Sequence, residues 1–255
     1  MLVDSHVHLD DERFDKDREK LIERFEKDGI SYVLHAAYDL QSSVKAVNAS
    51  EKFEQIYASV GYHPHDAKDV TEESLQIIRS LTKKSKVVAI GEIGLDYHYD
   101  HSPKDIQKKW FIEQIRMAKE LDMPYIVHDR EAHGDIYNIM KTEKYSGTRG
   151  ILHCYSGNVE LAREFIKMGF LISLAGPITF SNARKTKEVA KEIPLEHLLI
   201  ETDSPYLTPA PFRGKRNEPS YVRYVAQEIA SIKEVSFESV AKATTDNFKR
   251  LFKIT

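Results

Sequence analysis

The amino-acid sequence predicts a (β/α)8 barrel, the TIM-barrel fold of the α/β class, in a single domain over residues 1–255. Short apolar or β-branched runs, typical of buried parallel strands, recur eight times along the chain. Charged stretches with helical spacing lie between these runs, and about 250 residues is the usual length of such a barrel. No linker, low-complexity stretch or block of charge marks a domain boundary.

The predicted elements follow from these runs in chain order. The eight strands are expected at residues 2–3, 32–34, 56–60, 87–90, 125–127, 151–152, 170–174 and 198–200. Ser102 and Pro103 favour the start of a helix, and Gly29 and Gly169 favour helix ends. The same alternation also fits a doubly wound open sheet, which stays the alternative fold.

The composition excludes several classes of protein. Lys and Arg total 37 against 40 Asp and Glu, so the net charge of -3 leaves no general basic coat for nucleic acid. Any phosphate that binds must therefore meet a local positive charge or a metal ion. A single cysteine excludes an internal disulfide framework and a cysteine-based zinc cluster. No signal peptide or membrane span is predicted, so we expect a cytoplasmic protein.

Histidines and carboxylates follow most of the apolar runs at the same relative place. In a barrel of this kind, the carboxyl ends of the strands carry the chemistry. His6 and His8 are two residues apart, so on a strand both imidazoles point to the same side and can hold one metal ion. The candidate ligands are His6, His8, Glu92, His128, His153 and Asp203. A single catalytic ion needs fewer than these six ligands. Two divalent cations that share a bridging carboxylate would use all six.

Six sequence motifs surround these candidate ligands. They read Asp4-Ser5-His6-Val7-His8, Gly61-Tyr62-His63-Pro64-His65, Gly91-Glu92-Ile93-Gly94-Leu95-Asp96, Val127-His128-Asp129-Arg130, His153-Cys154-Tyr155-Ser156-Gly157 and Glu201-Thr202-Asp203-Ser204-Pro205-Tyr206. In this combination and order, they resemble the motifs of the TatD family of metal-dependent deoxyribonucleases, over nearly the whole chain. The resemblance implies a first metal held by His6, His8, Glu92 and Asp203, and a second held by Glu92, His128 and His153.

The resemblance also implies hydrolysis of phosphodiester bonds in single-stranded DNA, as a 3′-5′ exonuclease. Two divalent cations bring more positive charge than Glu92 and Asp203 remove, so the site would attract phosphate in an acidic protein. Metal coordination lowers the pKa of a bound water from about 15.7 towards roughly 7, and we expect the resulting hydroxide to attack the phosphodiester. Asp203 is the candidate to orient or deprotonate this water.

Three further residues are predicted to contact the substrate. His63 and His65 share one side after the third run, where they can contact the scissile phosphate, and His63 can also donate a proton to the leaving group. A proline-stiffened loop with both histidines hydrogen-bonded to the backbone is the alternative. Arg213 lies in the basic segment 213–217, which either binds flanking phosphates or is only a solvated loop.

Other residues beside the motifs have two interpretations each. Asp96 can orient a ligand histidine or cap a helix. The aromatic residues that follow motif residues can stack on bases, although packing is the simpler interpretation for Tyr97, Tyr155 and Tyr206.

The metal ligands do not specify the bond that is cleaved. A carboxylic ester or amide hydrolase, such as a D-aminoacyl-tRNA deacylase, could use the same dinuclear site. A non-catalytic scaffold is a third interpretation, which the complete ligand set disfavours. Histidine-rich ligation suits zinc, manganese, iron or cobalt, and the carboxylates also admit magnesium, so the identity of the two cations stays open. The predicted partner is DNA as substrate, with no membrane, and no protein partner can be inferred.

Overall fold

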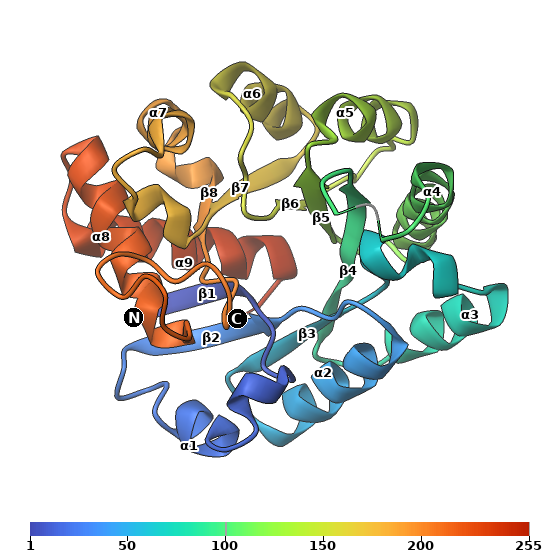
Figure 1. The fold of residues 1–255 in the computed structure, drawn as a ribbon, viewed down its shortest axis with the longest axis horizontal. Coiled ribbons are helices and arrows are strands. Elements are labelled where there is room, and N and C mark those ends of the chain that lie inside the picture. Colours follow the sequence, from blue (N-terminus) through green and yellow to red (C-terminus); the bar gives the residue numbers. More distant parts are fainter. Residues whose placement is uncertain (100, 255) are drawn as a thin grey trace. The chain divides into compact units, whose positions relative to one another are not determined.

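The computed structural model describes residues 1–99 and 101–254, and within these ranges eight strands alternate with helices (Figure 1). The chain divides into two compact units. Unit 1 consists of Met1–His35, Cys154–Glu164 and Ile172–Thr255, and unit 2 consists of Ala36–His153 and Phe165–Leu171. A single domain over residues 1–255 stays a prediction, and its last residue lies outside the described residues.

Unit 1 contains both ends of the eight-strand series. Its strands are β1 (Leu2–Val7), β2 (Ile30–His35) and β8 (Leu198–Ile200), together with most of β7 (Phe170–Leu174). Its helices are α1 (Arg18–Glu23), α7 (Arg184–Glu192), α8 (Val222–Lys233), α9 (Phe237–Phe252) and the first part of α6 (Val159–Lys167), with the 3-10 helices η1 (Glu12–Phe14), η3 (Gly176–Thr179), η4 (Leu195–His197) and η5 (Pro219–Tyr221). Helix α9 packs on β1 and β8, and Phe248 of α9 is fully buried there.

Unit 2 contains four consecutive parallel strands. These are β3 (Ile56–Val60), β4 (Val87–Asp96), β5 (Tyr125–Arg130) and β6 (Gly150–Leu152), paired in this order. Its helices are α2 (Leu40–Lys52), α3 (Glu72–Leu81), α4 (Lys104–Glu120) and α5 (His133–Thr142), with the 3-10 helix η2 (Pro64–Asp69). Capping boxes begin α2 at Asp39 and α3 at Thr71, since each side chain accepts a hydrogen bond from the backbone three residues on.

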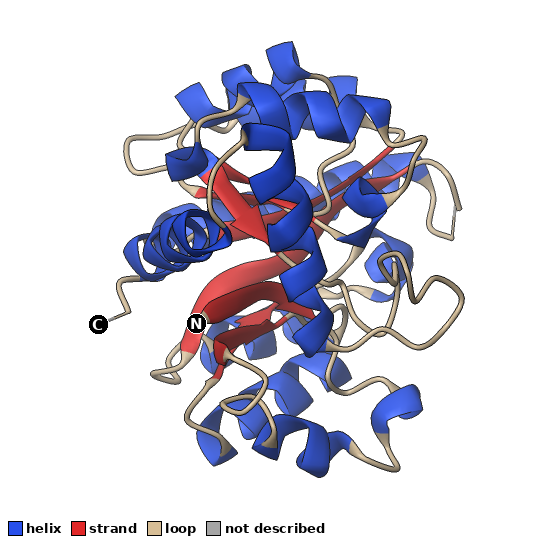
Figure 2. Cartoon of the chain, turned by 90° about the vertical axis from the view of Figure 1, so that its left-hand side faces the viewer, coloured by secondary structure: helices blue, strands red, loops and turns tan. Residues whose placement is uncertain are grey.

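The pairing in unit 1 decides between the two fold classes. Strand β1 pairs in parallel with β2, and Val7 at its end is also bridged in parallel to Ser204, just after β8. The first strand therefore has neighbours on both sides, as in a closed barrel, whereas a doubly wound sheet leaves its outer strands open. The chain has the predicted (β/α)8 fold, and its alternating helices and strands are coloured separately in Figure 2.

Two local predictions differ from the structure. The fourth apolar run predicts a strand over residues 87–90, with Glu92 and Asp96 after it, but β4 continues through Asp96. After a register shift between Ile90 and Ile93, the residues up to Asp96 stay paired with β5. Helix α4 begins at Lys104 with Pro103 as its N-cap residue, and the hydroxyl of Ser102 instead donates to the His65 carbonyl at 2.7 Å. None of the helices within the described residues is long and apolar enough to cross a membrane.

Gly94 in β4 is required by the close approach of β5. Its φ is +148°, and a Cβ atom there would overlap the carbonyl oxygen of His128. Gly94→Ala should therefore lower the free energy of unfolding by about 3 kcal/mol, measured by urea denaturation. Gly134 of α5 is the matched control, because a Cβ atom there meets nothing within 4 Å, and Gly134→Ala should raise stability by about 0.5–1 kcal/mol. Equal urea midpoints for the two variants would contradict this account.

Candidate metal centre

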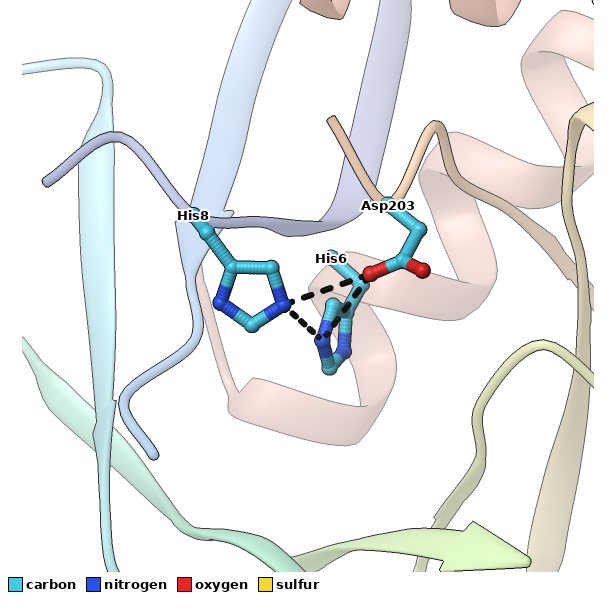
Figure 3. Close-up of side chains that lie close together, drawn as sticks. All are labelled: His6, His8 and Asp203. Carbon is cyan, nitrogen blue, oxygen red and sulfur yellow. Dashed lines mark hydrogen bonds and ion pairs between the residues drawn. The ribbon is translucent and has the colours of Figure 1, made fainter. Parts of the chain in front are cut away.

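One cluster of candidate ligands lies in unit 1 and contains His6, His8 and Asp203, which point towards one another (Figure 3). We call it the unit 1 cluster. The Nε2 atoms of His6 and His8 are 3.3 Å apart, and Asp203 Oδ1 lies 3.3 Å from His8 Nε2 and 3.8 Å from His6 Nε2. Two ligands at roughly 2.05 Å from a tetrahedral zinc ion are about 3.3 Å apart. The spacing of the three atoms therefore fits the ligands of one ion.

Asp4 joins β1 to the segment that carries Asp203. Its Oδ1 accepts a hydrogen bond from Thr202 N at 2.9 Å, and its Oδ2 accepts one from Thr202 Oγ1 at 2.5 Å. Burial raises the pKa of Asp4 well above its usual value, and the hydrogen bonds from Thr202 oppose this shift only in part. Asp203 N donates to the carbonyl of His6 at 2.9 Å. The two strand ends are thus held together at the residues that carry the ligands.

Asn217 holds the same segment from its other side. Its side-chain amide donates to the carbonyls of Thr202 at 2.9 Å and Tyr206 at 2.6 Å, and its side chain is fully buried. Sequence analysis did not find the roles of Asp4 and Asn217. The sequence holds one signal for the role of Asp4. It stands two residues before His6 and therefore points to the same side of β1.

A second cluster lies in unit 2 and contains His63, Glu92, His128 and His153, which we call the unit 2 cluster. Glu92 Oε1 is 2.7 Å from His153 Nε2, 2.8 Å from His128 Nδ1 and 3.6 Å from His63 Nε2. The facing ring nitrogens of His128 and His153 are 3.2 Å apart. This is again the separation of two ligands of one ion. Imidazole nitrogen and carboxylate oxygen are also the donors that zinc and similar divalent cations accept.

Asp96 orients His128 in this cluster. Its Oδ2 lies 3.1 Å from His128 Nε2 and 2.9 Å from His65 Nε2, and a carboxylate can only accept these bonds. Burial alone would raise the pKa of Asp96, but the hydrogen bonds from His128 and His65 outweigh it and hold that pKa far below its usual value. With Nε2 of His128 engaged, its Nδ1 faces Glu92 and His153. Such carboxylate–histidine pairs fix the ring of a metal ligand.

His63 lies with Glu92 and His128 in a group whose ligand atoms are close enough to hold one metal ion, a position that the sequence did not predict for it. Its Nδ1 accepts from the backbone N–H of His65 at 3.1 Å, so in the neutral ring the proton sits on Nε2. Burial lowers the pKa of His63 well below its usual value, and the nearby His128 adds to the effect. The Nε2 atom of His63 faces the unit 2 cluster, where it lies 3.6 Å from Glu92 Oε1.

The other predicted substrate contacts have different surroundings. His65 is held by Asp96, and its ring contacts that of His63 at a centroid distance of 4.3 Å. The exposed guanidinium of Arg213 lies over the ring of Phe180 at 4.5 Å. Arg216, three residues on, makes two 2.7 Å hydrogen bonds to Asp17, so its charge is neutralised within the protein. Of these two arginines in the basic segment, Arg213 is the better placed to meet a phosphate.

The three tyrosines beside the motifs differ in exposure. The hydroxyl of Tyr97 donates to Asp135 at 2.6 Å, and that of Tyr155, only 4% exposed, donates to the Asn158 carbonyl at 2.8 Å. These two side chains are packed and anchored. Tyr206, in contrast, is 46% exposed.

The chain is similar to known proteins over nearly its whole length. A family model described as TatD related DNase matches residues 3–253. The metal-dependent hydrolase YabD of Bacillus subtilis is 52% identical over 254 residues, which cover 100% of both chains. The metal-dependent hydrolase YcfH of Escherichia coli is 39% identical over 256 residues, which cover 99% of this chain and 96% of YcfH.

Solved structures agree with the family and with the fold. The crystal structure of YjjV, a TatD homologue from Escherichia coli, matches with a TM-score of 0.94 at 29% identity and covers 100% of this chain and 98% of its own. A TatD-family hydrolase from Entamoeba histolytica matches with a TM-score of 0.88 at 26% identity and covers 100% and 98%. The predicted resemblance is confirmed, and the chain belongs to the TatD family of metal-dependent hydrolases.

Proposed function

We propose that the protein is a deoxyribonuclease that hydrolyses single-stranded DNA from its 3′ end, with two divalent cations. The observation that carries the proposal is the spacing of imidazole nitrogens and carboxylate oxygens in both clusters, which fits the ligands of an ion. His6, His8 and Asp203 would hold one cation. Glu92, His128 and His153 would hold the other, and the additional bond from Glu92 to the first cation stays a prediction from the sequence.

Divalent cations, when bound, bring positive charge to a phosphate and lower the pKa of a coordinated water. The side chains of the protein have separate tasks. Asp203 accepts the proton of the attacking water, since its carboxylate is only partly buried and lies among the candidate ligands, 3.3 Å from His8 Nε2. His63 donates its Nε2–H to a phosphate oxygen, and Arg213 binds a flanking phosphate. His65 supports this arrangement through its bond to Asp96.

The test combines metal analysis of the purified protein with cleavage of end-labelled oligonucleotides. We expect two equivalents of divalent cation per chain and shortening of single-stranded DNA from the 3′ end. A chelator should abolish this cleavage, and added zinc, manganese, magnesium, iron or cobalt should restore it. The assay panel should include RNA, bis-p-nitrophenyl phosphate and aminoacyl esters.

Two outcomes would contradict the proposal. Robust cleavage of aminoacyl esters without any phosphodiester cleavage would favour a carboxylic ester or amide hydrolase, such as a D-aminoacyl-tRNA deacylase. Absence of any chelator-sensitive turnover would indicate a non-catalytic scaffold. The cytoplasmic location stays a prediction and needs its own fractionation experiment.

A further inference from the structure

We propose that the ring of Tyr206 is a stacking surface for a nucleobase of the substrate, beside the unit 1 cluster. This inference rests on the proposed nuclease function and names the part of the substrate that one side chain recognises. From the sequence alone, packing is the simpler interpretation of Tyr206, and stacking on a base is the alternative. In the structure, three features of Tyr206 favour stacking: its place beside the candidate ligands, the side chains that contact its ring, and its exposure to solvent.

The backbone fixes Tyr206 close to the candidate metal ligands. Its N–H donates to the carbonyl of Asp203 at 2.9 Å, and its own carbonyl accepts from the Asn217 side chain at 2.6 Å. The ring lies edge-on to that of His8, with a centroid distance of 6.0 Å and an interplanar angle of 78°. A base on this ring would therefore lie next to a nucleotide whose phosphate is at the unit 1 cluster.

Two neighbouring side chains hold the ring in place. The guanidinium of Arg13 lies 4.1 Å from the ring centroid, and the Tyr206 hydroxyl donates to Asp11 Oδ2 at 3.2 Å. Arg13 also makes two 2.8 Å hydrogen bonds to Asp11, and this pairing lowers the pKa of Asp11 to about 2. The charge of Arg13 is thus paired with Asp11, and the hydroxyl of Tyr206 has a hydrogen-bond partner in Asp11 as well. A ring that is held by such contacts loses less conformational entropy when a ligand stacks on it than a ring without them.

Tyr206 keeps a large exposed fraction although these two side chains contact it. The residue is 46% exposed, and the adjacent Leu207 is 37% exposed. The hydroxyls of Tyr97 and Tyr155 are hydrogen-bonded as well, but Tyr155 is buried and Tyr97 is only partly exposed, so Tyr206 is the most exposed of the three. A large, rigid, exposed aromatic ring beside candidate metal ligands offers a flat apolar surface, and in single strands the unpaired bases are free to cover it.

Stacking of this kind has a distinct signature. Every base has an aromatic face, so the contact tolerates any sequence and does not read the sugar 2′-hydroxyl. Loss of one base–aromatic contact weakens binding on the order of tenfold. The effect must disappear when the substrate lacks the base, and this separates stacking from a general structural role.

The experiment compares the metal-loaded wild type with Tyr206→Leu on two single-stranded oligonucleotides, one normal and one with an abasic residue near the 3′ end. We expect Tyr206→Leu to raise KM for the normal oligonucleotide about tenfold, and to change KM for the abasic one far less. Tyr32→Leu is the matched control, because Tyr32 of β2 in the same unit also has a cation, Lys249, over its ring at 5.9 Å. This control should leave both KM values unchanged.

A binding measurement makes the inference independent of turnover. Stacking on Tyr206 should quench 2-aminopurine in an oligonucleotide with phosphorothioate linkages at its 3′ end, and Tyr206→Leu should abolish this quench while Tyr206→Phe retains it. Cleavage by the wild type with equal quench and equal KM in Tyr206→Leu would overturn the stacking surface and leave the nuclease function standing. Equal losses on normal and abasic substrates would also overturn it. A Tyr206-dependent quench without any DNA cleavage would support the stacking surface and reject the nuclease function.

Discussion

Asp203→Asn is expected to lower turnover on single-stranded DNA by about 10²–10⁴-fold, because the amide cannot accept the proton of the attacking water. The substitution keeps the size of the side chain and leaves the Asp203 N–H free to donate to His6 as before. The folded state should therefore persist, with an unfolding midpoint close to that of the wild type. The measurement is the rate constant of cleavage under single-turnover conditions, together with the metal content of the variant.

Asp10→Asn is the matched control for this prediction. Asp10 Oδ1 lies 3.1 Å from His35 Nε2 in the same unit, so the variant also weakens a buried carboxylate–histidine pair. It should cost about 1–3 kcal/mol of stability and leave turnover near the wild-type value at a temperature where the variant is folded. Near-normal turnover in Asp203→Asn would remove Asp203 from the mechanism.

Glu92→Gln is expected to release the cation of the unit 2 cluster and to lower turnover at least about 100-fold. The carboxylate oxygen of Glu92 lies within 2.8 Å of nitrogens on both His128 and His153, and a neutral amide of the same size is a much weaker ligand. Metal analysis of the purified variant should show fewer equivalents per chain than the wild type, and the loss of turnover should follow the loss of metal.

Glu143→Gln serves as the control for Glu92→Gln. Glu143 pairs with Arg116 in the same unit, away from the candidate ligands, and such surface pairs contribute at most about 1 kcal/mol. This variant should keep its full metal content and turnover. Wild-type metal content in Glu92→Gln would show that Glu92 is no metal ligand.

Much of the fold was predictable because the strand pattern is local. Buried parallel strands are short apolar runs, and their recurrence is visible in the sequence alone. Strand β1 was predicted only over residues 2–3 because polar residues follow, yet Asp4 and Ser5 are both buried in it. Ser5 Oγ reaches Ser173 Oγ at 3.0 Å and donates to the Ile200 carbonyl at 3.1 Å. Hydrogen bonds between residues so distant in sequence cannot be inferred from the local pattern of apolar and polar residues.

The residues of the candidate site were predictable from the sequence, whereas some of the contacts between them were not. The i, i+2 spacing of His6 and His8 places both near the end of β1. Within unit 2, neighbouring strands bring Glu92, His128 and His153 together, with Glu92 and His128 inside β4 and β5 and His153 directly after β6. The tautomer of His63 was not predictable, because it depends on a backbone hydrogen bond in η2. The support of Tyr206 by Arg13 was not predictable either, since these residues are adjacent only in the folded chain.

The hydrogen bonds between Asp4 and Thr202 join positions that are 198 residues apart. A ribosome adds about 5–20 residues per second, so roughly 10–40 s pass between synthesis of the first strand and arrival of its partner segment. His6 and His8 leave the ribosome early and must wait for Asp203, whereas Ala36–His153 carries all the donors of its own cluster in one continuous stretch. The candidate donors of the unit 1 cluster are therefore completed only after those of the unit 2 cluster have been synthesised.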